Sequence, residues 1–290
     1  MSFRVMALCA LLLGSLSAQS ANLVTLVKNK LAAGDLTSGI AAVEDYKRDT
    51  GVDAEYLNAV GWLARGAYML DRPELADRYI AELHQQIPQE KADLTVPFGA
   101  AIEVEGRLIQ ARQGRGAALR HYKTALDAAK DPALRSRINK NINLLSLEGE
   151  QAPPINGVSF HGKPALVFLW AQWCGDCKAS ATSLTHIAEK YRSKGLAVIA
   201  PTRYYGTVDE KPATPEEEKA RVEKVWKESY AGLADAQVPI DDAAHIRYGA
   251  SATPTFVLID RKGVVRFYAP TRLSEEELSQ RIDALLAEGE

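Results

Sequence analysis

Residues 170–177 read Trp-Ala-Gln-Trp-Cys-Gly-Asp-Cys, which sets Cys174 and Cys177 two residues apart. An apolar run ends at this point and a helical pattern begins. Cys174 is therefore expected at a helix N-terminus, where unpaired backbone N–H groups and the positive end of the helix dipole stabilise a thiolate. Cys177, in the first turn, is close enough to form a disulfide with it. The pair predicts thiol–disulfide exchange, in which Cys174 attacks a partner and Cys177 resolves the mixed disulfide.

The overall composition is that of a soluble globular protein. The chain has 290 residues, of which 47% are hydrophobic and 25% charged, and its net charge is −2. This length is typical of two domains. The near-neutral charge does not indicate binding to nucleic acid or to an anionic membrane surface.

Residues 1–20 are interpreted as a signal peptide. Arg4 precedes a ten-residue apolar run over residues 5–14, which is too short for a transmembrane helix. Small residues follow, so cleavage is expected after Ala18, Ser20 or Ala21. The expected location is outside the cytoplasm, in a bacterial periplasm. The alternative is that the segment stays uncleaved as an N-terminal membrane anchor.

Removal of the signal peptide would also remove Cys9 and leave Cys174 and Cys177 as the only cysteines. A secreted protein that depends on structural disulfides normally has more of them, between distant positions. Closing so small a loop constrains the unfolded chain little. A redox function therefore explains the pair better than a stabilising one.

Residues 21–149 form a predicted all-α domain of helical hairpins. Apolar residues recur at helical spacing over residues 23–31, 56–70, 74–83, 101–111 and 117–129. Two sets of residues have the spacing of the small and turn positions in tetratricopeptide helix pairs, namely Ala64, Ala76, Ile80 and Pro88, then Gly106, Ala118, Tyr122 and Ala125. The domain thus resembles tetratricopeptide repeats. Two readings stay open, a docking surface for a protein partner and a helical cap or spacer.

Residues 150–154 are a predicted linker, because two consecutive prolines in it stop a helix. Residues 155–290 alternate between strand and helix patterns in the order β-α-β-α-β-β-α. Such an order predicts an α/β domain with a mixed central sheet and helices on both faces.

The C-terminal domain resembles the thioredoxin superfamily. The segment around Cys174 is similar to the active-site segment of that family, and Ala-Thr-Pro-Thr-Phe at residues 252–256 is similar to its cis-proline loop. The N-terminal signal and an insertion at about residues 204–235 are typical of the TlpA-like extracytoplasmic branch. The resemblance covers about residues 152–288.

The resemblance implies a role for each site residue. Cys174 would be the nucleophile and Cys177 the resolving thiol. Pro254 would be cis and would place the backbone of Thr253 beside the disulfide, where it pairs with an extended substrate chain. The rim of the site would comprise Trp173, Gly175 and Asp176. The expected partners are protein thiols and disulfides and an upstream dithiol electron donor, without a dissociable cofactor or a metal.

Some positions depart from the family pattern. Phe168 and Ser180 stand where relatives have a carboxylate that assists the resolving cysteine, and Thr182 stands near the usual kinking proline. We hypothesise that Asp176 partly substitutes for that carboxylate. Its charge would also oppose thiolate formation at Cys174, which favours a reducing dithiol.

Three alternatives compete with a protein-disulfide reductase. A zinc site needs four ligands, and His186 is the only nearby histidine on the same predicted helix. A peroxiredoxin-like peroxidase needs a proline and a threonine where this chain has Val167 and Ala171. The third alternative is a helical docking module with an accessory redox domain. Arg203, Tyr204 and Tyr205 either line the site or pack within a loop.

Overall fold

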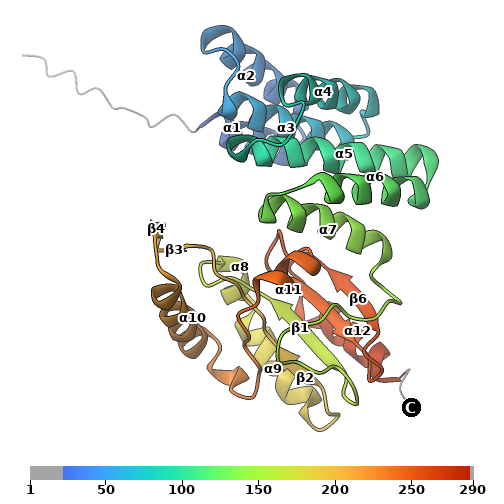
Figure 1. Ribbon diagram of the computed structural model, residues 1–290, viewed down its shortest axis with the longest axis vertical. Coiled ribbons are helices and arrows are strands. Elements are labelled where there is room, and N and C mark those ends of the chain that lie inside the picture. Colours follow the sequence, from blue (N-terminus) through green and yellow to red (C-terminus); the bar gives the residue numbers. More distant parts are fainter. Residues whose placement is uncertain (1–21, 288–290) are drawn as a thin grey trace, which may run out of the picture.

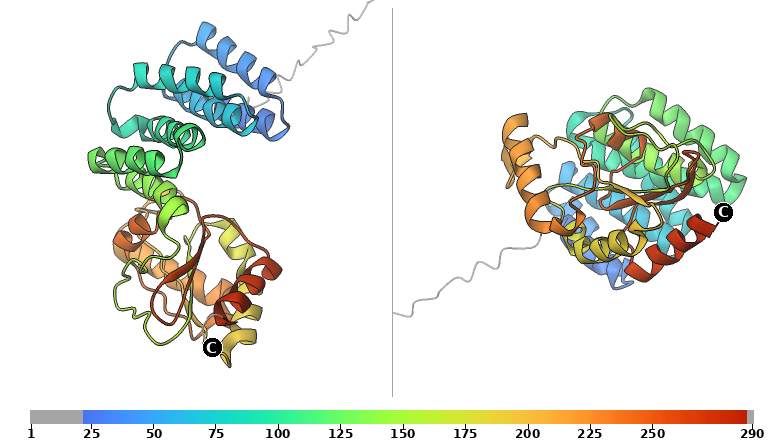
Figure 2. Two further views of the ribbon diagram at one scale, coloured as in Figure 1. Left: turned by 90° about the vertical axis from the view of Figure 1, so that its right-hand side faces the viewer. Right: turned by 90° about the horizontal axis from the view of Figure 1, so that it is seen from below.

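The computed structural model describes residues 22–287, which form a stack of helices followed by an α/β domain (Figures 1 and 2). The expected signal peptide and Cys9 lie outside the described residues. Within residues 22–287, no helix combines the length and the apolar character that crossing a membrane requires.

The N-terminal region is all-α, as predicted. Its seven α-helices are α1 (Leu23–Ala32), α2 (Leu36–Asp49), α3 (Ala54–Met69), α4 (Pro73–Gln86), α5 (Thr95–Gln113), α6 (Arg115–Ala128) and α7 (Pro132–Ser146), with a 3₁₀ turn at η1 (Ala92–Leu94). The five periodic segments of the sequence fall in α1, α3, α4, α5 and α6. The apolar pattern did not single out α2 and α7. Both begin at an aspartate, Asp35 or Asp131, whose side chain accepts a hydrogen bond from a backbone N–H of the first turn.

Helices α5 and α6 approach each other closely at Gly106, one of the positions in the predicted repeat spacing. The side chain of Tyr122 on α6 lies over Gly106 on α5, where a Cβ atom would come within 2.2 Å of the tyrosine ring. Its hydroxyl donates a 2.9 Å hydrogen bond to the backbone oxygen of Glu103. The two helices can approach this closely because residue 106 has no side chain.

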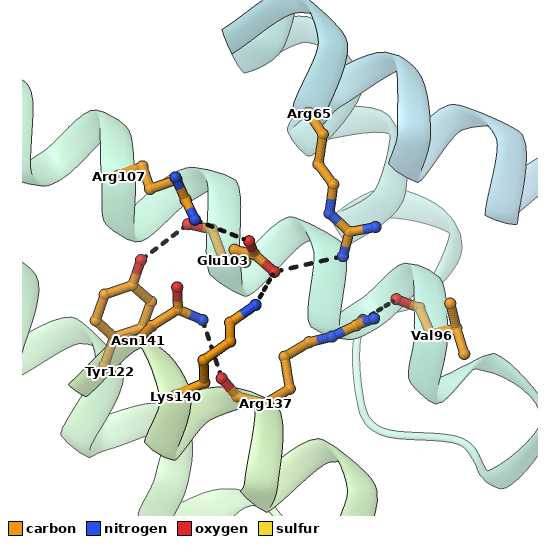
Figure 3. A network of polar contacts seen from close by, with 8 residues as sticks. All are labelled: Arg65, Val96, Glu103, Arg107, Tyr122, Arg137, Lys140 and Asn141. Atoms are coloured by element: carbon orange, nitrogen blue, oxygen red, sulfur yellow. Dashed lines mark hydrogen bonds and ion pairs between the residues drawn. The ribbon is translucent and has the colours of Figure 1, made fainter. Parts of the chain in front are cut away.

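A charged network lies between the helices α3, α5 and α7 (Figure 3). The Glu103 carboxylate is almost fully buried and lies 3.2–3.5 Å from cationic groups of Arg65, Arg107 and Lys140. Arg137 adds a further positive charge nearby. Burial alone opposes ionisation of Glu103, but the surrounding cations outweigh it, so the pKa of this carboxyl is lowered.

The α/β domain contains the predicted mixed sheet. Its four strands are arranged in the order β2 (Ala197–Ile199), β1 (Ala165–Leu169), β5 (Thr255–Ile259) and β6 (Val265–Ala269). The pair β1–β2 is parallel, whereas β1–β5 and β5–β6 are antiparallel. The helices are α8 (Gly175–Ala179), α9 (Ala181–Arg192), α10 (Pro215–Ser229), α11 (Asp242–Arg247) and α12 (Glu275–Ala287).

Both faces of the sheet are covered, which explains why β1 is apolar at every position. Leu166 and Phe168 point to a core shared with α9, α10 and α12. Val167 and Leu169 point to the opposite core, which α11 covers. This alternation keeps the central strand rigid, and the active-site segment follows directly after it.

The insertion after β2 is partly structured. It contains two short strands that the sequence did not predict, β3 (Thr207–Val208) and β4 (Lys211–Pro212), then α10 and the turn η2 (Ala231–Leu233). The fully buried carboxylate of Glu218 on α10 accepts hydrogen bonds of 2.6 and 2.8 Å from the backbone N–H groups of Tyr205 and Gly206. It thereby holds the start of the insertion in place.

Helix α7 joins the two domains of the molecule (Figure 1). Asn139 and Asn143, one turn apart on α7, each donate a 2.9 Å hydrogen bond to a backbone oxygen at the C-terminal end of α11, those of Ile246 and Arg247. These oxygens lie in the last turn of α11, where the helix supplies few donors, and that of Ile246 also accepts a 3.0 Å hydrogen bond from the backbone N–H of Gly249. The asparagines therefore cap α11 from the other domain.

The segment predicted as a linker, residues 150–154, is docked on the α/β domain. The backbone groups of Glu150 and Ala152 hydrogen-bond with Val265 and Gly263 at the edge of β6. Tyr248 and Arg247 donate to the carbonyl oxygens of the two prolines, at 2.7 Å each. Residues 150–154 are therefore held on the α/β domain by these bonds, next to the contact between α7 and α11.

Candidate functional site

The site begins where β1 ends. The indole N–H of Trp170 donates a 3.0 Å hydrogen bond to the carbonyl oxygen of Ala200, and the Trp170 oxygen accepts one of 2.9 Å from the hydroxyl of Thr202. Trp170 is fully buried. These bonds tie the end of β1 to the chain that follows β2, so the next residues leave the sheet in a defined direction.

Cys174 and Cys177 form a disulfide in the structure, with Cα atoms 5.3 Å apart. Cys174 is the N-cap of α8, and its Sγ atom accepts a 3.0 Å hydrogen bond from the backbone N–H of Cys177. The same N–H can stabilise a thiolate on Cys174 when the pair is reduced. Cys174 is 4% exposed and Cys177 fully buried. An incoming group can thus reach only Cys174.

The loop before β5 lies against this disulfide. The carbonyl oxygen of Thr253 is 3.5 Å from the Sγ of Cys174. The peptide bond between Thr253 and Pro254 is cis, as the resemblance implied. The hydroxyl of Thr255 donates a 2.7 Å hydrogen bond to the oxygen of Ala252, which closes the loop on itself. The residues 174, 177, 253 and 254 therefore come together from two distant segments.

Aromatic and basic side chains form the rim on one side of the disulfide. Trp173 is 56% exposed, an unusual state for so large an apolar residue. Its ring meets the edge of Tyr205, with centroids 5.3 Å apart, and the Arg203 guanidinium lies 4.4 Å from the centre of the Tyr205 ring. Arg203 and Tyr205 therefore lie at the site, whereas Tyr204 lines a separate hollow beside α10.

Gly175 and Asp176 form the opposite side of the rim. No atom lies within 4 Å of the position that a Cβ on Gly175 would take, so this side is open. The Asp176 side chain is 71% exposed and lies 3.9 Å from the guanidinium of Arg272. Arg272 was not anticipated from the sequence, since it lies about a hundred residues further along the chain.

The two positions that departed from the family pattern are buried. Phe168 is fully buried and packs on Phe256, with ring centroids 5.5 Å apart. Ser180 separates α8 from α9, and its hydroxyl donates a 2.9 Å hydrogen bond to the oxygen of Asp176. A serine that bonds to the preceding turn can bend a helix without a proline.

His245 is buried below this rim. One ring nitrogen lies 3.1 Å from the carbonyl oxygen of Pro201, so the imidazole donates there, and the other nitrogen has no partner among the described residues. Burial lowers the pKa of His245 to about 4. The residue is therefore neutral at physiological pH and holds α11 against the loop after β2.

Gln172 is a residue of the site that the sequence analysis missed. It is almost fully buried, and its side-chain amide donates a 2.8 Å hydrogen bond to the oxygen of Thr207 in β3. It thereby connects the active-site segment to the insertion. Only its burial marks Gln172 as part of the site. Burial cannot be seen in the sequence, so no local pattern pointed to this residue.

Three residues bear on the peroxidase and zinc alternatives, namely Val167, Ala171 and His186. Val167 and Ala171 are apolar and fully buried. His186 on α9 pairs at the surface with Glu275, at 3.1 Å. Within residues 22–287, no three His, Cys, Asp or Glu side chains are grouped so that they could hold a metal ion.

The α/β domain is similar to known proteins. A family model described as Redoxin matches residues 144–284. The soluble secreted antigen MPT53 of Mycobacterium tuberculosis is 31% identical over 134 residues, which are 46% of this chain and 69% of the relative. The thiol:disulfide interchange protein DsbE of Xylella fastidiosa is 26% identical over 162 residues, 56% of this chain and 74% of the relative.

Solved structures show the same likeness. A secreted Mycobacterium tuberculosis disulfide oxidoreductase, homologous to Escherichia coli DsbE, is 24% identical with a TM-score of 0.34. The match covers 47% of this chain and 96% of that structure.

Proposed function

Because the chain belongs to the redoxin family of thioredoxin-like thiol:disulfide oxidoreductases, we propose that Cys174 and Cys177 exchange with cysteines of other proteins outside the cytoplasm. One observation carries the proposal, namely that the Sγ of Cys174 lies at the start of α8 and 3.5 Å from the oxygen of Thr253. A substrate strand beside Thr253 would present its own sulfur to Cys174.

The exchange is a two-electron transfer in two steps. The Cys174 thiolate attacks one sulfur of a substrate disulfide, which forms a mixed disulfide and releases the other substrate sulfur as a thiolate. The Cys177 thiolate then attacks Cys174, and the second substrate sulfur leaves and takes up a proton. The substrate gains two electrons and the Cys174–Cys177 disulfide forms. An upstream dithiol returns the chain to its reduced state by the same steps.

Reduction of substrates is the direction we favour. The Asp176 carboxylate between the two cysteines disfavours a thiolate on Cys174, and thiolate stabilisation is what makes such a pair strongly oxidising. Equilibration of the full chain with a glutathione redox buffer measures the reduction potential. A value near −120 mV, about that of the strongest dithiol oxidants, would contradict this direction.

Substitution of each cysteine tests the exchange itself. The Cys177→Ala variant should accumulate a mixed disulfide on Cys174 with its substrate proteins, and Cys174→Ser should accumulate none. The reduced wild-type chain should also reduce the small neutral compound hydroxyethyl disulfide. A Cys174→Ser chain that retained full exchange activity would refute the mechanism. One that lost exchange but still captured a protein partner would point to the helical docking alternative.

A further inference from the structure

A cavity of about 240 Å³ opens beside the disulfide, between the helical domain and the α/β domain. The helical domain contributes Thr95, Val96 and Arg137 to its lining. The α/β domain contributes Trp173, Arg203 and Thr253. Since Trp173 precedes Cys174 and Thr253 touches it, a chain bound at the disulfide would extend into this cavity.

The lining of the cavity is basic. Among the described residues that line it there are two arginines and neither aspartate nor glutamate. Arg203 stacks on Tyr205, and no carboxylate within residues 22–287 lies at ion-pair distance from it. Two acids beside this loop, Asp242 on α11 and Glu218 on α10, accept hydrogen bonds from the backbone N–H groups of Tyr204 and Tyr205.

The arginine from the helical domain is held in a built position. The Arg137 guanidinium donates a 2.8 Å hydrogen bond to the oxygen of Val96, at the start of α5. Gly99, one turn further along α5, leaves room for it, since a Cβ there would lie 2.9 Å from a guanidinium nitrogen. Helix α5 also directs the positive end of its dipole toward this place.

Positive charge around Arg137 exceeds the negative charge. Figure 3 shows Arg65, Arg107, Arg137 and Lys140 around a single carboxylate, that of Glu103. Burial and the nearby charge of Arg65 lower the pKa of Arg137 to about 10. A further anion beside Arg137 would therefore be stabilised by a field that Glu103 does not fully neutralise.

From this arrangement we infer that the cavity is a substrate subsite that binds an acidic side chain near the reacting cysteine of a client polypeptide. The inference rests on the proposed function. The helical domain then forms a wall of the substrate site, and Arg137 and Arg203 become residues that determine specificity. The exposed ring of Trp173 provides an apolar contact next to the carboxylate position.

Three matched peptide disulfides test the subsite with the full-length chain. Each is a symmetric dimer of one short peptide with a central cysteine and Glu, Gln or Lys two residues to either side. For each peptide, the second-order rate constant for reduction by the protein is divided by the rate constant for reduction of the same peptide by dithiothreitol. This ratio corrects for the effect of neighbouring charges on the pKa of the leaving thiol. We expect the corrected Glu-to-Lys ratio to be about fivefold at low salt and to approach one in about 0.5 M NaCl.

Charge variants then assign the preference to the cavity. Arg203→Glu should invert the Glu-to-Lys ratio, and Arg137→Gln, which keeps a donor for the Val96 oxygen, should reduce it about twofold. Arg261→Glu is the matched control, because Arg261 is exposed in the β5–β6 turn at the far end of the sheet, and it should leave the ratio unchanged. If Arg137→Gln does not fold, Arg203→Glu alone decides.

The outcomes separate the subsite from the proposed function. Equal corrected rates for the three peptides, or a ratio that Arg203→Glu leaves unchanged, would overturn the subsite. A Gln peptide as fast as the Glu peptide would also overturn it, since the cavity would then bind polar rather than anionic groups. A wild-type chain that reduces neither hydroxyethyl disulfide nor any peptide would instead contradict the exchange function.

Discussion

Asn139 on α7 donates a 2.9 Å hydrogen bond to the carbonyl oxygen of Ile246 at the end of α11. The chain continues from α11 through Gly249 to Thr253, whose oxygen lies 3.5 Å from Cys174. The helical domain is thereby attached to the segment that bears the cis-proline loop. Contacts that are distant from the cysteines in sequence therefore bear on the geometry of the site.

The two asparagines of α7 should couple the folding of the two domains. In Asn139→Ala/Asn143→Ala the oxygen of Arg247 loses its asparagine donor and that of Ile246 keeps only the N–H of Gly249, at about 1 kcal/mol for each lost bond. We expect the free energy of unfolding to fall by about 2 kcal/mol and the two domains to unfold at different denaturant concentrations. Tryptophan fluorescence mainly reports on the α/β domain, which has three of the four tryptophans, and far-UV circular dichroism mainly reports on the helices.

Asn29→Ala is the control for this double variant, because Asn29 is exposed within α1. It measures how much the higher helix propensity of alanine by itself changes the free energy of unfolding. Coincident transitions with an unchanged midpoint in the double variant would show that the asparagines do not couple the two domains.

Gly249 should be intolerant of any side chain. It has φ +63°, and a Cβ there would lie 2.2 Å from the backbone nitrogen of Lys140 on α7. Because backbone cannot move aside as a flexible side chain can, Gly249→Ala should cost more than about 2 kcal/mol of unfolding free energy and should slow disulfide exchange. Chemical denaturation and exchange with hydroxyethyl disulfide measure the two effects.

Gly51→Ala provides the matched comparison, since Gly51 has φ +98° and no atom within 4 Å of its Cβ position. The loss of unfolding free energy in Gly51→Ala therefore measures backbone strain alone, about 1 kcal/mol, without a steric clash. Equal losses in the two variants would mean that the contact of Gly249 with α7 is of no consequence.

Glu103 should be essential to the helical domain because it is the carboxylate among four cations. Glu103→Gln leaves Arg65, Arg107 and Lys140 without their partner, and we expect a loss of about 3 kcal/mol at pH 7. Glu105→Gln, two residues further and half-exposed, should cost less than about 1 kcal/mol. Urea unfolding measures both.

The pH dependence of this effect has a definite sign. The pKa of Glu103 is lower in the folded chain than its ordinary value of 4.5, so its contribution is present above pH 4.5 and is lost as the pH falls through the folded pKa. The difference between wild type and Glu103→Gln should therefore narrow below pH 4.5. A difference independent of pH between about 3 and 7 would argue against an ionised Glu103.

Asp176 should moderate the reactivity of Cys174. Asp176→Asn removes a negative charge beside the nucleophile, so the pH midpoint for alkylation of Cys174 should move down by a few tenths of a unit, and the reduction potential should rise. The change is small because the carboxylate is 71% exposed and pairs with Arg272. Arg272→Ala should act in the opposite direction, and an upward shift in Asp176→Asn would refute the hypothesis.

Much of the site could be predicted from sequence because its elements depend on local order. The spacing of Cys174 and Cys177, the apolar β1 and the helix after it place the disulfide at a helix N-terminus whatever surrounds them. The cis-proline loop was identified by its resemblance to a family. The same local patterns predicted the order of the sheet strands and helices in the α/β domain, apart from the short strands β3 and β4, and the all-α character of the helical domain.

The contacts between distant segments could not be predicted, because they depend on burial and orientation. In the sequence, Asn139 and Asn143 look like part of an ordinary polar helix face. Only the structure shows that α11 packs against them. Arg137 and Arg203 are 66 residues apart, and only the docking of the two domains makes them neighbours of one cavity. The sequence by itself thus determined the chemistry of Cys174 and Cys177, a matter of local backbone geometry. The tertiary structure alone decided which side chains surround the disulfide, because that depends on how two separate cores pack together.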